Sequence, residues 1–500
     1  MLLLSLLFVF IFQPVLPIRG LDFSFPLWTI LLTLGVYGAF SNLNSLRSRQ
    51  NIIDTLIITG SLLLISLTRF ISYDGIITAS RPPQLQKILP VILIGAGAAF
   101  LLNDLTCKGK KWPKQFLVTL ILAILVILKT PALAMLFSRT ARSLNGQATD
   151  TALSTDIRWF GFSYIAFRLL SILIDSLKGR KADLCLGDFL IYVCFPPALS
   201  AGPIDRWDRF SKEFTAGSKN TTGEDFTAGC GQIALGLFHK FILADSLAKM
   251  ALSAQNARQF IHSGWAWAAL FAYALQIYFD FSGYSDMAIG IGRCLGFHFN
   301  ENFNHPYCCN SVTDFWRRWH ISLGSFFRDY VYIPMGGNRK MQWRNVLCVW
   351  FLTGMWHGAS WNFIIWGLFF GVILVIEKLF ILKKIKDIPV VGNVYSLLMV
   401  YIGWGIFYFT DFANMKLFFS RIFTSGEFYN FADVQAITSN LWLWVAAIAL
   451  CMPLRKVLEQ KITKPEFNCA YRITISVLVI LFSTALLVGA TNNAFLYFRF

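Results

Sequence analysis

The sequence predicts an all-α polytopic membrane protein, because it is very apolar, carries few charges and is organised in long apolar segments. Hydrophobic residues make up 56% of the 500 residues and charged residues only 14%, against about 25% charged residues in soluble proteins. The mean hydropathy is +0.57, and the chain contains 48 Phe and 16 Trp. A soluble core cannot bury so much apolar surface, and the same composition excludes disordered, collagen-like and disulfide-stabilised proteins.

A bilayer core requires about twenty apolar residues per helix. The candidate spans are 1–15, 26–40, 52–67, 88–102, 116–137, 159–177, 186–199, 229–251, 265–281, 346–376, 391–409, 441–454 and 473–488. Several are too short for a full crossing, so we expect about ten to twelve true spans, the others being re-entrant or interfacial. The first segment lacks a basic n-region and a cleavage site, which predicts a retained anchor rather than a signal peptide.

Polar connections separate the apolar segments, and none is long enough to form a soluble domain. They are expected at 139–156, 205–225, 335–345 and 411–439. We therefore treat 1–500 as a single integral membrane domain. Its expected parts are the N-terminal helices at 1–189, a central core at 190–380 and the C-terminal helices at 381–500.

The net charge of +17 is spread over short runs of Lys and Arg between the apolar segments. This distribution is typical of cytoplasmic loops that fix topology beside anionic lipid. Nucleic-acid binding would need a basic face with interleaved aromatic residues on a soluble module, which the sequence lacks. The ten cysteines are scattered and form no C-x-x-C pair, so they indicate neither a zinc site nor a disulfide framework.

His357 lies inside the apolar run 346–376, which contains no formally charged side chain. The run is too long for one ordinary span, so a break or re-entrant turn is expected between Gly354 and Asn362. Gly354 and Gly358 would permit close approach of another backbone, and Asn362 offers a hydrogen bond to orient the imidazole. A neutral imidazole in apolar surroundings suits a general base acting on a hydroxyl. The alternative is a histidine that only hydrogen-bonds between helices.

His320 lies in the segment 314–330, which is rich in aromatic and basic residues. At about 100° per residue, the side chains on its face are Trp316, Gly324, Phe327 and Val331. This pattern predicts an amphipathic helix at the membrane interface, with space for a substrate beside Gly324. Alternatively, the segment is a Trp and Arg belt that anchors an interfacial helix, and His320 is incidental.

Three arginines near His320 are candidates for donor binding: Arg317, Arg318 and Arg328. Guanidinium groups suit the oxygens of a phosphate or of a pantetheine-type donor, although snorkelling to lipid headgroups is the more common role. Asp314 and Trp316 belong to the same candidate binding group. The turn at 334–339 lacks P-loop spacing, so nucleotide binding is not indicated.

Other polar groups occur inside apolar stretches. Asp280 and Asp286 suit a proton relay or contact with a polar substrate, but capping of a helix that restarts after Gly283 explains them equally well. The segments 195–197 and 202–206 indicate a broken helix whose backbone polar groups must be buried in protein. The histidines show no H-x-x-H or H-E-x-x-H spacing, so no metal site is predicted.

Taken together and in order, these motifs resemble the membrane-bound O-acyltransferase family. The resemblance is closest to the branch that contains alginate O-acetyltransferase and teichoic acid D-alanyltransferase. It covers 190–380 densely and the rest of the chain by topology only. The segments that carry it are 195–197, 202–206, 278–287, 301–307, 314–320, 328–330, 336–339, 356–358 and 495–500.

The resemblance implies that His357 matches the catalytic histidine of the family and that His320 matches the second histidine required in this branch. It also implies a ring of helices around a thinned membrane centre, where a tunnel from each side meets at the catalytic histidine. An acyl thioester, either acetyl-CoA or an acyl carrier, enters from the cytoplasmic side as a substrate. No bound cofactor or metal is then required.

We therefore expect a multi-pass O-acyltransferase of the plasma (inner) membrane that transfers an acyl group, foremost acetyl, toward an exported cell-envelope polysaccharide. The expected partners are the lipid bilayer, extracytoplasmic acyltransferase or polysaccharide-assembly proteins and a cytoplasmic acyl carrier protein, but not nucleic acid. D-Alanyl transfer to teichoic acid is the alternative enzyme activity. A proton-coupled exporter of polymer or lipid is an alternative of another class, and a non-catalytic envelope scaffold is a third.

Overall fold

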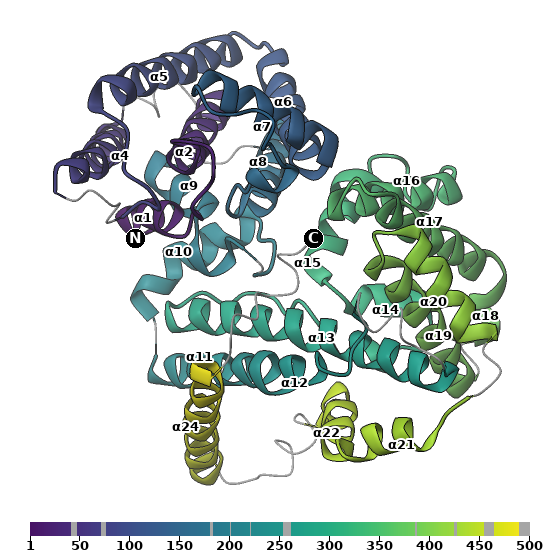
Figure 1. Ribbon diagram of the computed structural model, residues 1–500. Coiled ribbons are helices and arrows are strands. Elements are labelled where there is room, and N and C mark those ends of the chain that lie inside the picture. The colour runs from purple at the N-terminus through teal and green to yellow at the C-terminus, as the bar shows by residue number, and fades with distance from the viewer. Residues whose placement is uncertain are drawn as a thin grey trace. The chain divides into compact units, whose positions relative to one another are not determined.

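The computed structural model describes residues 1–41, 48–71, 77–180, 184–200, 202–220, 222–253, 262–385, 388–424, 428–454 and 465–489. Every regular element within these residues is a helix (Figure 1), which confirms the predicted all-α class. The aromatic ending at 495–500 and the basic residues at 455–464 lie outside the described residues.

The chain divides into two compact units. Unit 1 contains residues 1–200 and 204–212, and unit 2 contains 201–203 and 213–500. The expected three-part organisation at 1–189, 190–380 and 381–500 stays a prediction. Both predicted histidines, and the segments that surround them, belong to unit 2.

Unit 1 is a bundle in which α2 packs on α5 and α8. Its helices are α1 (Leu2–Ile11), α2 (Leu21–Phe40), α4 (Arg49–Leu67), α5 (Leu85–Cys107), α6 (Trp112–Lys129), α7 (Pro131–Leu144), α8 (Phe162–Leu177), α9 (Leu186–Val193) and the first residues of α10 (Trp207–Asn220). The span expected at 116–137 is confirmed as far as Lys129, but its last part is wrong. Helix α6 ends and α7 begins around Pro131, because proline cannot donate a hydrogen bond within a helix. The polar loop expected at 205–225 is also wrong in part, since it contains α10.

The predicted helix break near the Pro-Pro pair is confirmed in unit 1. Helix α9 ends at Val193, and a single 3₁₀ turn, Pro196–Ala198, follows it. Buried Arg168 donates hydrogen bonds to the carbonyls of Tyr192 (3.2 Å), Val193 (2.8 Å) and Ala198. One guanidinium thus satisfies the carbonyls that the break releases inside an apolar bundle, where water cannot.

Unit 2 is organised around α11 and α13, which lie side by side (Figure 1). Its elements are α11 (Gly223–Leu237), the π-helix η4 (Phe238–Ala244), α12 (Asp245–Leu247), α13 (Ser263–Cys294), α14 (Val312–Arg318), α15 (Ile321–Phe327), the π-helix η7 (Arg328–Tyr332), α16 (Gln342–His357), α17 (Trp361–Ile376), η8 (Glu377–Ile381), α18 (Leu382–Ile385), α19 (Pro389–Tyr408), α20 (Phe412–Thr424), α21 (Phe431–Thr438), α22 (Leu441–Cys451) and α24 (Pro465–Gly489). The polar loop expected at 411–439 is wrong in part, because α20 and α21 lie in it.

Helix α13 corrects the expectation that a helix restarts after Gly283. It runs without interruption from Ser263 to Cys294, so Asp280 and Asp286 do not cap a new helix. Gly283 has a packing role, because a Cβ at this position would lie 2.7 Å from the carbonyl oxygen of Gly236. The glycines allow α11 and α13 to approach at backbone contact distance.

The break expected in the long apolar run around His357 is confirmed. Helix α16 ends at His357 and α17 begins at Trp361, and the two helices pack against each other. Gly354 makes this contact close, since a Cβ there would lie 2.4 Å from the carbonyl oxygen of Phe363. His357 is therefore the last residue of one half of a helical hairpin.

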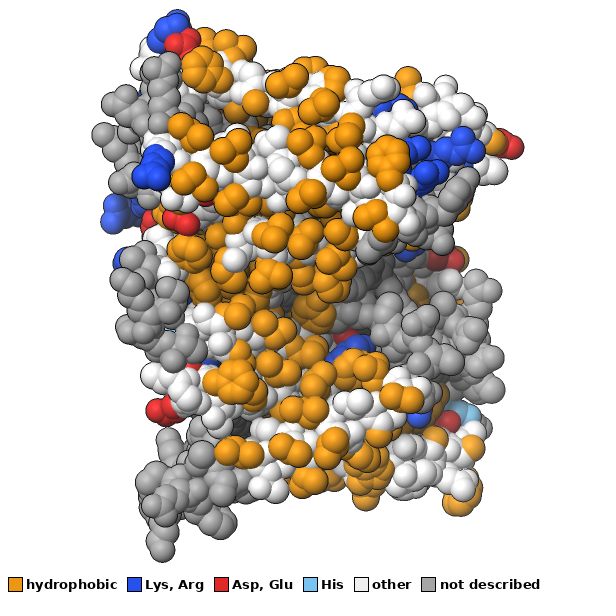
Figure 2. All heavy atoms as spheres, turned by 90° about the vertical axis from the view of Figure 1, so that its left-hand side faces the viewer, with side chains coloured by type: hydrophobic (Ala, Val, Ile, Leu, Met, Phe, Trp, Pro, Cys, Tyr) orange, Lys and Arg blue, Asp and Glu red, His pale blue; other side chains and the backbone are white. Residues whose placement is uncertain are grey.

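Membrane character is evident from helix length and from the surface. Within the described residues, seven helices are long and apolar enough to span a bilayer, or eight if the bent pair α21 and α22 forms one span, and three apolar helices are shorter. The expected ten to twelve spans are reached only when these shorter helices are counted as well, and the expected ring around a tunnel stays a prediction. Hydrophobic side chains cover much of the face in Figure 2, as expected of a multi-pass membrane protein.

Candidate functional site

A cavity of about 350 Å³ in unit 2 brings His320 and His357 together. They reach it from different elements, since His357 ends α16 and His320 precedes α15. The other lining residues are Thr313, Trp316, Arg317, Trp319, Leu323, Gly324, Phe327, Arg328, Tyr332, Asn338, Val346, Val349, Trp350, Thr353, Trp366, Leu374 and Lys378. Most are apolar or aromatic, so the histidines lie in an environment of low polarity.

His357 is surrounded by aromatic rings. Its ring packs edge-on against Trp366 (5.1 Å between centroids) and Phe407 (5.2 Å), and Trp356 lies 4.7 Å away. The helix break leaves it only 9% exposed. Neighbours of this kind hold the imidazole in place while keeping bulk water away, which suits proton transfer within a closed site.

His320 occupies a bend that the sequence pattern did not predict. Helix α14 ends at Arg318 and α15 starts at Ile321, while His320 has a left-handed backbone with φ of +45°. The single amphipathic helix expected here is therefore wrong. Three of the four residues predicted to share the face of His320, namely Trp316, Gly324 and Phe327, nevertheless line the cavity with it. A non-glycine residue in this conformation is strained, and such strain is often retained at functional sites.

The side chain of Asn302 holds the His320 ring. Its Oδ1 lies 3.1 Å from Nδ1 of His320 and accepts hydrogen bonds from the backbone N–H (3.2 Å) and hydroxyl (2.9 Å) of Ser322. The backbone of Asn302 also contributes, since its carbonyl accepts the N–H of Ile321 at 2.9 Å. Asn302 is 1% exposed, so these bonds form away from solvent.

The imidazole of His320 is buried and neutral. It lies between two helices that are too short to cross a membrane, and burial lowers the pKa of its imidazole to about 3. Nε2 is buried and has no hydrogen-bond partner among the described residues. A neutral imidazole with one unused nitrogen is able to accept a proton from a hydroxyl group.

Cationic side chains line the same cavity where it reaches the surface. Arg317 and Arg328 are exposed and Lys378 is half-buried, with its ammonium 5.4 Å from the ring of Tyr332. Arg328 is also paired with Asp329 at 2.7 Å. Of the three cations, Arg328 is the one that forms an ion pair within the described residues, so we take Arg317 and Lys378 as the charges that can bind a ligand at the cavity opening.

Several predicted site residues lie elsewhere. Arg318 pairs with Asp314 at 3.0 Å, and neither lines the cavity. The Nδ2 group of Asn362 donates to the carbonyl of Phe407 at 3.0 Å, which ties α17 to the end of α19.

Asp286 belongs to a second polar cluster between α11, η4 and α13. It accepts a hydrogen bond from Gln232 at 2.6 Å and lies 3.2 Å from Nδ1 of His239. Nearby, Lys240 pairs with Asp245 and Asp280 at 2.8 and 2.7 Å. These pairs neutralise the charges that the tightly packed helices bury.

Glu377 is a buried residue that sequence reasoning missed. It is 0% exposed, and its carboxylate accepts the backbone N–H groups of Val312 and Thr313 at 2.7 Å each, together with the hydroxyl of Thr313. The carboxylate therefore caps the first turn of α14, the helix that carries Trp316 and Arg317. The only signal in the sequence was an acidic residue at the end of a long apolar run.

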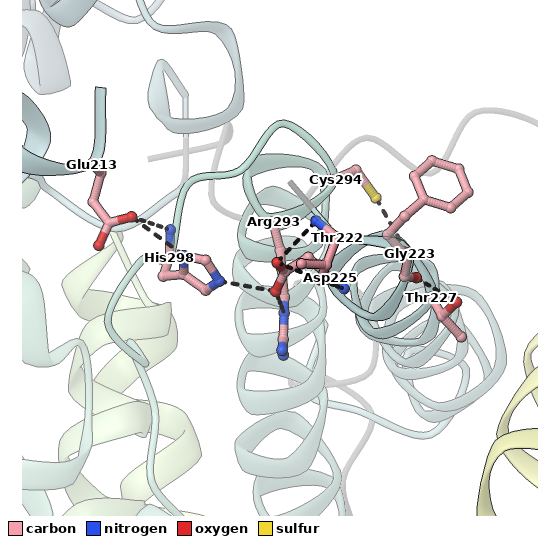
Figure 3. A network of polar contacts seen from close by, with 9 residues as sticks. Glu213, Thr222, Gly223, Asp225, Thr227, Arg293, Cys294 and His298 are labelled. Carbon is pink, nitrogen blue, oxygen red and sulfur yellow. Dashed lines mark hydrogen bonds and ion pairs between the residues drawn. The ribbon is translucent and has the colours of Figure 1, made fainter. Parts of the chain in front are cut away.

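His298 forms a separate network at an exposed position (Figure 3). Its Nε2 lies 3.1 Å from Asp225 and its Nδ1 lies 3.3 Å from Glu213, while Arg293 also pairs with Asp225 at 3.4 Å. The hydrogen bond with Asp225, assisted by Glu213, raises the pKa of His298, against a smaller opposing contribution from burial. Because both nitrogens face carboxylates, the network is complete only when the ring is protonated.

The His298 network predicts a pH-dependent stability. Its contribution should be fully present below the pKa of an unfolded histidine, about 6.5, and should be lost as the pH rises through the higher folded pKa. We expect the melting temperature of the detergent-solubilised protein to fall more between pH 6 and pH 8.5 than that of His298→Gln. The effect should be small, because the His298 side chain is 50% exposed. Equal falls in both proteins would contradict the prediction.

Two other cavities in the part of the chain that the structure describes differ from this site, and a small polar one near Asp175 and Arg180 has a volume of only about 20 Å³. Among the described residues, no group of three or more His, Cys, Asp or Glu side chains is arranged to hold a metal ion. Unit 1 has a cavity of about 400 Å³, but its lining is almost wholly apolar. The cavity with the two histidines is therefore the candidate active site.

Comparison with known proteins gives one family. The model of the membrane-bound O-acyltransferase family matches residues 86–419, a range that includes the whole cavity lining.

The names of similar curated proteins refer to alginate, peptidoglycan and teichoic acid. The probable alginate O-acetylase of Azotobacter vinelandii is 41% identical over 53% of this chain and 54% of its own length. The peptidoglycan O-acetyltransferase of Helicobacter pylori is 40% identical over 38% of this chain and 37% of its own length. The teichoic acid D-alanyltransferase of Bacillus subtilis is 32% identical over 47% of this chain and 62% of its own length. The first of these alignments thus spans about half the length of the relative.

Proposed function

The chain belongs to the membrane-bound O-acyltransferase family, and on this premise we propose that it transfers an acetyl group from a thioester donor toward the hydroxyl of an exported cell-envelope polysaccharide. The observation that carries the proposal is the cavity that both His320 and His357 line. O-Acetylation is favoured over D-alanylation because the two O-acetylating relatives are about 40% identical, against 32% for the D-alanyltransferase.

The chemistry requires a proton carrier and an apolar enclosure. The acceptor oxygen bonds to the thioester carbon, the C–S bond breaks, and the hydroxyl proton ends on sulfur as the thiol. His357 and His320 are placed to carry this proton. The surrounding aromatic residues exclude the water that would otherwise hydrolyse the thioester. The acceptor can also be a hydroxyl of an extracytoplasmic partner protein that passes the acyl group on to the polymer.

The donor is proposed to bind through Arg317 and Lys378. Acetyl-CoA or the pantetheine arm of a carrier protein presents phosphate oxygens, which both cations suit. We expect Arg317→Ala and Lys378→Ala each to raise KM for acetyl-CoA by about tenfold, the cost of a charged hydrogen bond, with a smaller change in kcat. Arg318→Ala should raise KM less, because Arg318 pairs with Asp314 outside the cavity. Initial rates of thiol release with solubilised protein would measure this, and an equal effect of all three changes would contradict it.

The experiment that tests the function is the ester content of the cell-surface polysaccharide in a deletion strain. The ester is released by mild base and identified by mass, and complementation uses the wild type, His357→Ala and His320→Ala at matched membrane levels. Loss of acetate that only the wild type restores would support the proposal.

Three other outcomes separate the alternatives. Loss of D-alanine would keep the family and replace the substrate. Loss of polymer export with unchanged esterification would favour the exporter. Full rescue by His357→Ala would favour a scaffold.

A further inference from the structure

We infer that Asn302 is a positioning residue that fixes the tautomer of His320, so that the ring exchanges its proton with substrate through Nε2. The inference rests on the proposed function. Asn302 does not line the cavity. Its Oδ1 contacts His320, and its Nδ2 anchors the amide to α13.

The orientation of the Asn302 amide is determined by its neighbours. The backbone N–H of Ser322 can only donate, so the amide atom 3.2 Å from it must be the oxygen. The opposite atom, Nδ2, donates to the hydroxyl of Ser285 on α13 at 3.1 Å. The amide is therefore held at both ends and cannot turn over without losing two bonds.

The fixed amide determines where the imidazole carries its proton. Oδ1 of Asn302 is an acceptor and lies 3.1 Å from Nδ1 of His320. Nδ1 must therefore be the protonated nitrogen, and Nε2 keeps its lone pair. A neutral histidine without such a partner would divide its population between two tautomers, only one of which is able to accept the proton at Nε2.

Among the described residues, no charged group forms a hydrogen bond or ion pair with the His320 ring. The elements packed against it contribute Phe281 from α13 (4.8 Å between ring centroids) and Trp356 from α16 (6.2 Å), in addition to Asn302 and Ser322. The titratable groups that share the cavity are His357, Arg317, Arg328, Tyr332 and Lys378. Burial lowers the pKa of His320. The uncharged amide of Asn302 therefore acts by selecting which ring nitrogen carries the proton.

The role in catalysis follows from this geometry. The hydroxyl proton, which His357 and His320 carry together, passes through Nε2 of His320 as the acceptor oxygen bonds to the thioester carbon. The same proton leaves with the sulfur when the C–S bond breaks, and the imidazole returns to its neutral form. Nδ1 remains bonded to Asn302 throughout, so the ring needs no rotation between the two steps.

Two substitutions of Asn302 distinguish an effect on the His320 tautomer from a loss of side-chain packing. Asn302→Leu removes the acceptor and should lower kcat by about 10–100-fold, as loss of such orienting partners does, with KM for acetyl-CoA changed less. Asn302→Asp keeps the acceptor and adds a charge beside Nδ1, which raises the imidazole pKa by about one to three units. Its activity should be retained at high pH, and the acid limb of its pH–kcat profile should move to higher pH, because a protonated ring cannot accept the proton.

Two further variants complete the set. Ser285→Ala frees Nδ2 and should have a smaller effect than Asn302→Leu. Asn304→Asp is the matched control, since Asn304 is an exposed asparagine two residues away on the same segment, and it should leave both kcat and the pH profile unchanged.

A spectroscopic measurement tests the tautomer without relying on activity. In protein labelled with ¹⁵N-histidine, the His320 ring should show a protonated Nδ1 and an unprotonated Nε2, with the signals assigned by their loss in His320→Gln. The signals should move toward the average of two tautomers in Ser285→Ala and Asn302→Leu. A wild-type ring protonated at Nε2, or an unshifted pH profile in Asn302→Asp, would overturn the inference. Failure of the wild type to restore any ester would instead overturn the proposed function.

Discussion

Replacing His357 with alanine should lower the rate of acyl transfer by about 10²–10⁴-fold, the usual contribution of a positioned acid–base group. The ring lies in the cavity shared with His320 and is held by Trp356, Trp366 and Phe407. His320→Ala should cause a loss of similar size. The two losses should not add in the double variant, because groups that carry one proton act as a unit. Thiol release from acetyl-CoA and the ester content of the polysaccharide would both measure the effect.

The controls for this prediction separate chemistry from packing. His357→Gln keeps a polar side chain among the same aromatic rings, so it should retain more thermal stability than His357→Ala while remaining inactive. His298→Ala removes an exposed histidine that does not line the cavity, and it should leave the rate unchanged. Wild-type ester levels in His357→Gln would refute an acid–base role for His357.

The fold was predictable where a property depends on one segment of the chain. The all-α class, the spans and the break after His357 follow from segment length, apolar composition and glycine positions. The errors occur where the backbone departs from an ideal helix. Pro131 divides a predicted span in two, whereas α13 continues through Gly283, which packs against Gly236 of α11. Such a contact lies far away in sequence, so no periodicity reveals it.

The candidate site was predictable in its residues but not in its geometry. Helical periodicity placed Trp316, Gly324 and Phe327 beside His320, although the segment bends at that histidine. Both Arg317 and Arg318 were candidates for donor binding, and the structure shows that Arg317 lines the cavity whereas Arg318 pairs with Asp314. The contacts of Asn302 and Glu377 with the 312–322 segment require folding of distant segments, so composition and spacing cannot indicate them.

Loss of the Glu377 carboxylate should be the most damaging change to stability. Glu377→Ala leaves the N–H groups of Val312 and Thr313 buried without an acceptor, in an environment that water cannot supply. We expect a cost of about 3–5 kcal/mol in the free energy of unfolding. Thermal unfolding of the detergent-solubilised protein, followed by tryptophan fluorescence, would measure it. Glu224→Ala, which removes an exposed carboxylate, should leave the melting temperature nearly unchanged.

The same change should also reduce activity before the protein unfolds, because α14 connects the cap to the cavity. Once the first turn of α14 is released, Trp316, Arg317 and the bend at His320 lose their fixed position. Glu377→Gln offers the sharper comparison. Its amide oxygen can still accept one of the two backbone N–H groups, while its NH₂ group faces the second N–H and cannot accept it. Its loss of stability and its rise in KM should both lie between those of the wild type and Glu377→Ala. If Glu377→Gln matched the wild type in both, an ionised cap would be unnecessary. If it matched Glu377→Ala in activity alone, Glu377 would act on the donor more directly than through α14.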